Sequence, residues 1–398
     1  MKEIVYVQAG NLSNYTGTHF WNTQEAYIAE ESEDSLYDFD VSFREGLTPT
    51  GRPTFCPRLL VFDRKANFGT LAQSNALLGT SEEEPSSEDT PEIWNGEVSE
   101  YRQELVPKSI YHSGLDEMDD HDTNESANDT DSSEAVRYWS DFNRVYYIPR
   151  TVQKLPDPPE WENPDGDWDY GQTLFSQYDE DHALVEGDLR LFLEECDSPQ
   201  GIQIMNDTST FGGFMNSFIT SLRDQYGKLP CLVIPLLSDA VSRPLEIDNN
   251  TSKYAQFARL DVTRGFSPSG IPVYDKWSSG QPLQDSFITR IHAASYPIPT
   301  SFPPFFKRDV SHRRGVLTQP MECSVFSSLS TNTRTAHLFS SHASAIKIYL
   351  QRKPAVETLG FDADDLKDLV NDLWALHVNF GESGDSDSDD GSLGEDEA

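Results

Sequence analysis

The chain is poor in cysteine and in long apolar runs, and each shortage excludes a class of protein. Its 398 residues include four cysteines, which lie far apart and form no CxxC pair, so we expect free buried thiols and no disulfide scaffold. The nine histidines form no HExxH or HxH cluster, which leaves a zinc site without support. No apolar run approaches the roughly 20 residues that a transmembrane helix needs, so we expect a soluble protein.

The N-terminal segment also lacks the features of an import signal. A strand is expected almost at once, and it carries the acid Glu3. A matrix presequence is instead rich in arginine and poor in acids. We therefore expect no import into the interior of an organelle.

Basic residues are scarce as well, with 30 Lys and Arg against 67 Asp and Glu and a net charge of −37. Residues 81–134 hold 18 acids and two bases, and residues 381–398 hold eight acids and no base. This charge disfavours direct binding of nucleic acid. Both segments have too few aliphatic residues to offset chain entropy, so they are predicted to be a disordered insertion and a disordered tail.

The rest of residues 1–240 alternates between strand and helix patterns. Residues 58–63 are too apolar to alternate, as expected for a strand covered on both faces. A strand at 201–206, a loop at 207–213, a helix at 214–226 and a buried strand at 231–237 predict a βαβ unit. Apolar spacing predicts another helix at 182–196. These patterns predict an α/β domain with a Rossmann-type parallel sheet and helices on both faces.

Residues 241–380 carry a weaker pattern, which predicts a smaller α+β region. A short helix is expected within 285–295, a strand at 322–330 and a helix at 336–352. A final amphipathic helix is expected after Asp362, which is a favourable N-cap residue.

Three loops follow predicted strands and form the candidate site: 10–13, 63–65 and 208–213. In a doubly wound sheet, ligands bind at this edge because backbone N–H groups and helix N-termini converge there. The first and third loops can bind a phosphate, and Asp63 can hold Mg²⁺. The alternative for each loop is an ordinary turn or cap, which is the commoner role of these residues.

The segment EIVYVQAGNLSNYTGTHFW resembles the first strand, nucleotide-contacting loop and helix of tubulins. PRLLVFD is similar to a second tubulin strand, which places Asp63 where tubulins have an aspartate on the phosphate and magnesium side. Residues 200–228 resemble the tubulin phosphate loop and the helix after it. The residues of the first segment that match the tubulin pattern are Gln8, Ala9, Gly10, Asn14, Gly17, Phe20 and Trp21.

This resemblance implies a tubulin-like fold with a nucleotide-binding-type domain over 1–240, a second tubulin-like region over 241–380, and a GTP or GDP site with Mg²⁺. Asp63 would be the magnesium ligand. The residues carried over to the nucleotide pocket are Gly10, Asn11, Leu12, Asp63, Thr210, Gly212 and Gly213.

A closer resemblance is to the Misato family, tubulin-like proteins associated with mitochondria. It implies a role in mitochondrial distribution, morphology and inheritance of the organelle with its DNA. It also implies a peripheral location on the cytosolic face of mitochondria and in the cytoplasm, with protein partners there or on the cytoskeleton, basic ones among them. The matching residues are Thr18, His19, Trp21, Asn22, Gln24 and Glu25, then Val136, Trp139, Ser140, Asp141 and Phe142, then Glu194, Glu195, Cys196, Asp197, Gln200, Gly201, Gln203 and Ile204.

Departures from the tubulin pattern bear on chemistry. Residues 11–13 replace Gln-Cys-Gly, Phe211 stands at a glycine position, and Lys65 replaces an acid. No Gly-x-x-Asn-x-Asp segment completes a neighbouring subunit's site. We therefore expect a degenerate nucleotide pocket and a non-catalytic protein. The alternatives are a GTP-binding switch or slow GTPase, and an acidic chaperone for basic proteins that acts through 81–134 and 381–398.

Overall fold

The structure is a computed structural model. It describes residues 2–29, 38–47, 53–69, 71, 138–157, 167–236, 256–266, 287–298, 312–313, 316–317, 321–351 and 363–381. The predicted acidic insertion and all but the first residue of the acidic tail lie outside the described residues. The chain divides into one unit of Met1–Pro244 and Pro297–Met321 and a second of Leu245–Tyr296 and Glu322–Ala398.

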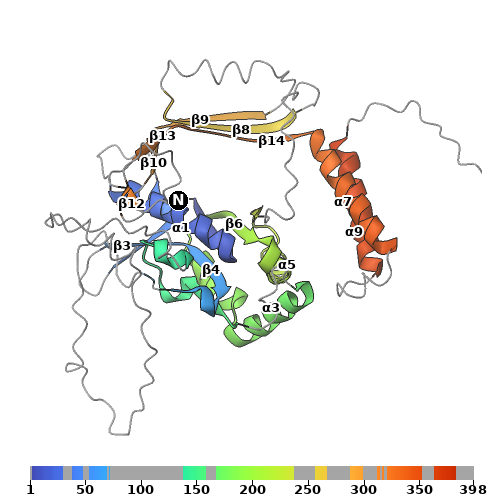
Figure 1. Ribbon diagram of the computed structural model, residues 1–398, viewed down its shortest axis with the longest axis horizontal. Coiled ribbons are helices and arrows are strands. Elements are labelled where there is room, and N and C mark those ends of the chain that lie inside the picture. The colour runs from blue at the N-terminus through green and yellow to red at the C-terminus, as the bar shows by residue number, and fades with distance from the viewer. Residues whose placement is uncertain are drawn as a thin grey trace, which may run out of the picture. The chain divides into compact units, whose positions relative to one another are not determined.

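A five-stranded parallel sheet forms the centre of the first unit (Figure 1). Its strand order is β5-β4-β1-β6-β7, so the chain runs outward from β1 through β4 and then crosses to β6 on the other side. The carboxyl ends of β1 and β6 therefore form the topological switch point. The strands are β1 (Glu3–Ala9), β4 (Leu59–Arg64), β5 (Val152–Leu155), β6 (Pro199–Asp207) and β7 (Cys231–Leu236).

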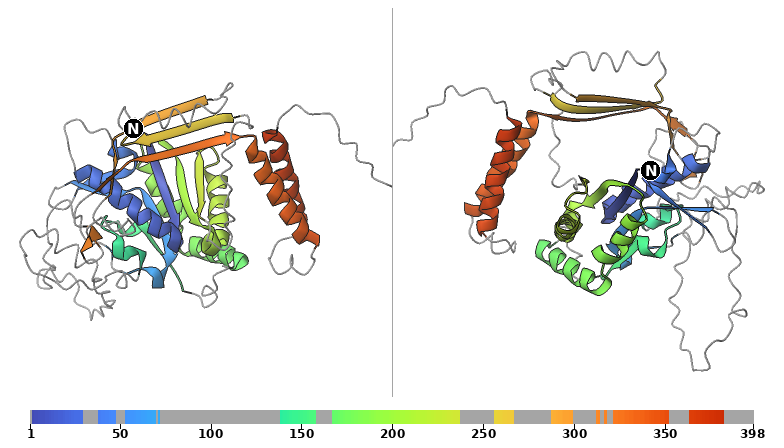
Figure 2. Two further views of the ribbon diagram at one scale, coloured as in Figure 1. Left: turned by 45° about the horizontal axis from the view of Figure 1, so that its top comes forward. Right: turned by 180° about the vertical axis from the view of Figure 1, so that it is seen from behind.

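Helices cover both faces of this sheet, which confirms the predicted α/β class (Figure 2). Alternate residues of each central strand face opposite sides, so the sheet separates two apolar cores. Val7 and Phe62 belong to the core beneath α3 (Trp168–His182) and α5 (Thr208–Gln225). Tyr6 and Val61 belong to the core beneath α1 (Asn11–Ala29).

Shorter elements complete the first unit. An antiparallel pair joins β2 to β3, and another joins β11 to β12. These elements are η1 (Phe39–Val41), β2 (Phe43–Leu47), β3 (Pro53–Pro57), η2 (Lys65–Asn67), η5 (Trp139–Phe142), η6 (Pro149–Thr151), η8 (Val185–Leu189), α4 (Arg190–Glu194), β11 (His312–Arg313) and β12 (Val316–Leu317).

Three predictions for the first unit are corrected. The helix expected at 182–196 is confirmed over 185–194 with its predicted apolar face buried. Its start is corrected, because Ala183 adopts a left-handed conformation that ends α3, and its first turn is π-helical. The loop expected at 207–213 is mostly helix, because Asp207 caps α5 directly after β6. The strand at 231–237 is not buried: in the described chain β7 is the edge of the sheet, and Leu232 is 53% exposed.

The second unit combines a small sheet with a helical hairpin. In the sheet, β8 (Gln256–Arg264) pairs antiparallel with β14 (Val325–Asn332) and parallel with β9 (Phe287–Ala293). The short helix expected within 285–295 is wrong, because this β-branched segment pairs along β8. The helices expected at 336–352 and after 362 are confirmed as α7 (Arg334–Gln351) and α9 (Ala363–Phe380).

The helices α7 and α9 pack side by side as a hairpin (Figure 1). Ala343 is buried on α7 and Leu366 on α9, and the His377 ring bonds to the Ala336 carbonyl at 2.8 Å. The remaining strands are β10 (Tyr296–Ile298) and β13 (Met321–Cys323). No helix in the described ranges combines the length and the apolar character needed to cross a bilayer.

Candidate functional site

Gly10 stands at the switch point, between β1 and α1, and the structure requires a glycine there for two reasons. Its φ of +91° is rarely adopted by residues with a Cβ. An added Cβ would also lie 2.6 Å from Asp207 Cβ and 2.9 Å from the Phe211 ring. The turn is thus pressed against the start of α5, and Gly10 and Thr210 of the predicted site come together, with Thr210 Oγ1 3.2 Å from that same Cβ position.

The residues after Gly10 bind α1 to β6. The Leu12 N–H donates to Asp207 Oδ2 at 3.4 Å, and the Ser13 hydroxyl donates to the Met205 carbonyl at 2.7 Å. Asn11 and Leu12 are exposed, and Ser13 is buried. Ser13, one of the departures from the tubulin pattern, therefore links α1 to β6 through a hydrogen bond.

Asp207 is the residue of this site that the sequence did not single out. It is buried and caps α5, because its Oδ1 accepts from the Ser209 N–H at 3.2 Å and from the Ser209 hydroxyl at 2.6 Å. The signal was present, since an Asp before a Thr/Ser run at the end of a strand is an N-cap pattern. The contact with Leu12, 195 positions away, had no local signal.

Asp63 lies at the carboxyl end of β4 and is fully buried. Its carboxylate accepts from Asn14 Nδ2 at 2.9 Å, from Asn67 Nδ2 at 2.7 Å and from the Arg64 N–H at 2.8 Å. Burial raises the pKa of this carboxyl, and the hydrogen bonds from Asn67, Asn14 and Arg64 partly offset the rise. Its acceptor capacity is therefore used within the protein.

Gly212 and Gly213 lie within α5, where they allow close packing of α3. A Cβ on Gly213 would lie 2.1 Å from the Trp168 carbonyl oxygen, and one on Gly212 would lie 3.0 Å from the Trp168 ring. Gly171 of α3 faces the backbone of the same turn, with a Cβ contact of 2.8 Å to the Phe214 nitrogen. These glycines serve a helix–helix contact.

Phe211 occupies the space between Gly10 and the interior. It is 2% exposed, packs at 5.9 Å from the Phe214 ring, and belongs to the core beneath α3 and α5. Thr210 Oγ1 is buried beside it without a hydrogen-bond partner among the described residues. The helix N-termini next to Gly10 thus face the Asp207 carboxylate, and the Phe211 ring packs on the interior side of the turn.

The residues present do not fit a nucleotide with Mg²⁺. Asp63, the residue predicted to hold the metal, is fully buried. Gly212 and Gly213 face α3. The N-termini of α1 and α5 already bind the Asp207 carboxylate. The described ranges contain no group of three or more His, Cys, Asp and Glu side chains placed to bind a metal ion. The residues expected to bind a nucleotide instead hold α1, β6 and α5 together.

Two of the segments that carry the Misato resemblance contact each other. Asn22 of α1 donates through Nδ2 to the Phe142 carbonyl at 2.7 Å and accepts from the Arg144 N–H at 3.0 Å. The His19 ring lies 5.0 Å from the Phe142 ring. The segment after the insertion is therefore fixed along α1.

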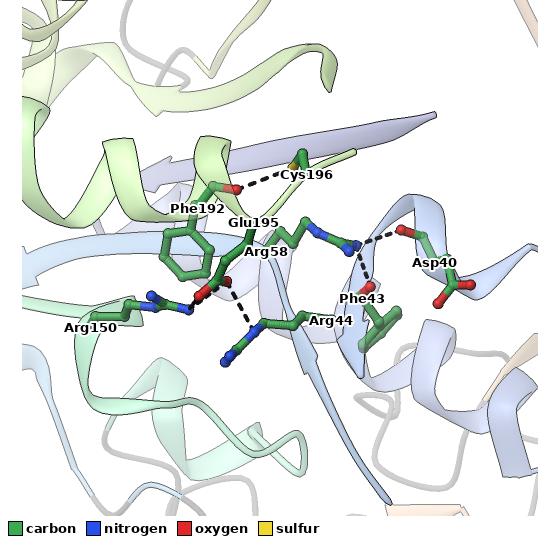
Figure 3. Close-up of polar contacts among 8 residues, drawn as sticks. All are labelled: Asp40, Phe43, Arg44, Arg58, Arg150, Phe192, Glu195 and Cys196. Carbon is green, nitrogen blue, oxygen red and sulfur yellow. Dashed lines mark hydrogen bonds and ion pairs between the residues drawn. The ribbon is translucent and has the colours of Figure 1, made fainter. Parts of the chain in front are cut away.

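The third such segment lies at the amino end of the sheet (Figure 3). Glu195, which follows α4, accepts from Arg150 Nη2 at 2.6 Å and pairs with Arg44 Nε at 3.0 Å. Arg150 also stacks on the Phe192 ring, 4.5 Å from its centroid. Cys196 donates to the Phe192 carbonyl at 3.1 Å. This cluster ties α4 to β2 and to the turn before β5.

Comparison with known proteins gives two family-model matches. Residues 2–117 match the Misato Segment II tubulin-like domain, and residues 128–285 match a tubulin domain. The second match begins just before the Trp139 segment and extends through the βαβ unit of Asp207.

Similar proteins carry the names DML1 and misato homolog 1. Protein DML1 of Gibberella zeae is 38% identical over 289 residues, which is 70% of this chain and 55% of that protein. Protein DML1 of Coccidioides immitis is 34% identical over 319 residues, 75% and 58% of the two chains. Protein misato homolog 1 of Danio rerio is 30% identical over 269 residues, 57% and 43%. The chain spans about half the length of these relatives. With the parallel sheet and the matched segments, these similarities show that the chain belongs to the Misato family of tubulin-like proteins.

Proposed function

We propose that this chain is a non-catalytic tubulin-like protein that acts in mitochondrial distribution, morphology and inheritance of mitochondria with their DNA. It would work at the cytosolic face of the organelle and in the cytoplasm, through protein partners. The mitochondrial role rests on the family resemblance. The absence of catalysis is supported chiefly by the sealed carboxylate of Asp63.

The state of Asp63 argues against catalysis for an energetic reason. To coordinate Mg²⁺ the carboxylate would have to give up its donors, Asn14, Asn67 and the Arg64 backbone. Leaving buried donors unsatisfied costs about 1–3 kcal/mol each. The metal would also have to reach a side chain that is 0% exposed. Without that metal position a phosphoryl transfer would lack the charge stabilisation that Mg²⁺ supplies.

The test of catalysis uses pure full-length protein. We expect mass spectrometry of released small molecules to find no stoichiometric GTP or GDP, and we expect no GTP turnover. Asp63→Asn is the matched variant, because it keeps the volume and removes the charge. Turnover by the wild type that Asp63→Asn abolishes without unfolding would disprove the proposal.

The cellular role needs a separate test. Cells that lack the protein should show altered mitochondrial distribution, and expression of the wild-type chain or of a folded Asp63→Asn variant should restore it equally. Restoration by the wild type alone would mean that Asp63 has a ligand. Normal mitochondria in the depleted cells would contradict the mitochondrial role itself.

A GTP-binding switch is the second candidate, and one observation favours it. Gly10 keeps the positive φ of a phosphate-binding turn at the switch point, with the N-termini of α1 and α5 beside it. Equilibrium dialysis with GTP and with GDP decides between the two. Retention of either nucleotide at micromolar concentration supports the switch, and no retention at millimolar concentration removes it.

A further inference from the structure

Asp207 lies where the N-termini of two helices meet. Its Oδ2 accepts from Leu12 in the first turn of α1, and its Oδ1 accepts from Ser209 in the first turn of α5. The helices have 19 and 18 residues, so each presents unpaired N–H groups and a partial positive charge at this end. In a doubly wound sheet such donors bind the phosphates of a ligand. Here the Asp207 carboxylate accepts hydrogen bonds from one such N–H group of each helix.

One buried polar atom near this carboxylate, Thr210 Oγ1, lacks a hydrogen-bond partner among the described residues. Thr210 Oγ1 lies 3.2 Å from the Cβ position of Gly10. Buried polar atoms are normally satisfied, so Thr210 Oγ1 is available to hydrogen-bond a further polar group at this position.

We infer that Asp207 decides which ions the switch point admits. Its carboxylate takes the place of a ligand phosphate and repels any further oxyanion, because two like charges a few ångströms apart strongly destabilise each other in a partly buried site. A neutral, smaller residue at 207 therefore opens the position to a phosphate group. The inference rests on the proposed absence of nucleotide binding in the wild-type protein and identifies the group responsible for it.

The experiment compares Asp207→Ser, Asp207→Asn and Asp224→Asn in the full chain. Ser and Asn are both good N-cap residues, so both variants retain a cap for α5. Asp224→Asn is the matched control, since it removes the same charge from an exposed position near the end of the same helix. Inorganic phosphate and pyrophosphate serve as probes, titrated by ³¹P NMR and calorimetry.

We expect no saturable binding to the wild type or to Asp224→Asn. Asp207→Ser should bind phosphate at least about tenfold more tightly than the wild type, in the millimolar range or better. Asp207→Asn should gain less, because it removes the charge but keeps the volume. Added salt should weaken the new binding.

Two results would overturn the inference. One is a cooperatively folded Asp207→Asn or Asp207→Ser protein that gains no affinity for either probe. The other is a wild type that binds phosphate as tightly as the Ser variant. GTP turnover by the wild type would instead contradict the proposed function, whatever the variants at 207 do.

Discussion

The side-chain amide of Asn14 donates to Asp63 across 2.9 Å, at a point where neither side chain is exposed. The same amide donates to the Phe62 carbonyl at 2.9 Å. Asn14 thus links the first turn of α1 to the carboxyl end of β4 through two hydrogen bonds. Both residues match the tubulin pattern, and here they hydrogen-bond to each other.

Asp63 should therefore matter for folding in the absence of any ligand. Asp63→Leu removes the acceptor of the Asn67 amide, of the Arg64 N–H and of one of the two Asn14 amide N–H groups, and we expect it to lower the free energy of unfolding by about 3 kcal/mol or more. Asp63→Asn keeps an acceptor oxygen and should lose about half as much. Urea denaturation of the ligand-free protein measures both. A carboxylate held in reserve for a metal would give unchanged or increased stability on substitution.

The two glycines of α5 should respond unequally to alanine. Gly213→Ala places a methyl group 2.1 Å from the Trp168 carbonyl oxygen, so we expect a loss of about 3 kcal/mol or more. Gly212→Ala meets only the Trp168 ring at 3.0 Å, and that side chain can shift, so the loss should be about 1 kcal/mol. Thermal unfolding compares them. Equal and small effects would mean that the α3–α5 contact is looser than the structure has it.

Two buried titratable groups of α1 should give opposite pH dependences. Burial raises the pKa of Glu25 from 4.5 to about 7, so its contribution to stability is lost as pH rises through that range. Burial lowers the pKa of His19 from 6.5 to about 4, so its contribution is lost as pH falls through that range. The slopes oppose each other where the ranges overlap, and the wild-type curve should be nearly flat there.

Glu25→Gln isolates the histidine. The stability of this variant should rise by about 2–3 kcal/mol from about pH 4 to about pH 6.5, and it should exceed that of the wild type above pH 7. Glu45→Gln, an exposed position, is the control and should follow the wild type. Chemical denaturation across this range measures the difference. Parallel curves for Glu25→Gln and the wild type would show that Glu25 titrates normally.

The arginines that share Glu195 should contribute unequally (Figure 3). The Arg150 side chain is 18% exposed, contacts both carboxylate oxygens and stacks on Phe192, so Arg150→Ala should cost about 2 kcal/mol. The Arg44 side chain is 38% exposed and makes one contact, so Arg44→Ala should cost less than about 1 kcal/mol. Double-mutant cycles with Glu195→Ala separate the two pairs. A larger coupling to Arg44 would reverse this ranking.

The ends of the insertion are held together, and this predicts that it can be removed. The Gly69 N–H donates to the Ser140 hydroxyl at 2.8 Å, and Phe68 packs on Trp139 at 5.3 Å. Replacing residues 72–137 with a flexible linker of about six residues should leave the melting temperature of the first unit nearly unchanged, because the closure cost grows slowly with loop length. Combining the deletion with Ser140→Ala should lower that temperature, and a large loss from the deletion alone would show that the insertion supports the fold.

The amino-acid sequence by itself determined the α/β class, because that class depends on local patterns. The apolar runs that form β4 and β6 and the amphipathic spacing of α5, α7 and α9 are each readable within a dozen residues. The matched segments around Gly10 and Asn22 likewise identify the family from the sequence alone. The start of the helix expected at 182–196 could not be predicted this way, because it depends on the left-handed conformation of Ala183, which ends α3.

Only the tertiary structure decided what the matched residues do. A Gly-Gly pair such as Gly212 and Gly213 can bind a phosphate or allow a neighbouring helix to pack closely. Here the pair contacts Trp168 because α3 crosses α5 at this point. The roles of Asp63 and Asp207 likewise depend on donors far away in the chain, Asn14 and Leu12. A sequence pattern fixes which groups reach the switch point of a parallel sheet, but hydrogen bonds between distant segments determine whether those groups remain available to a ligand.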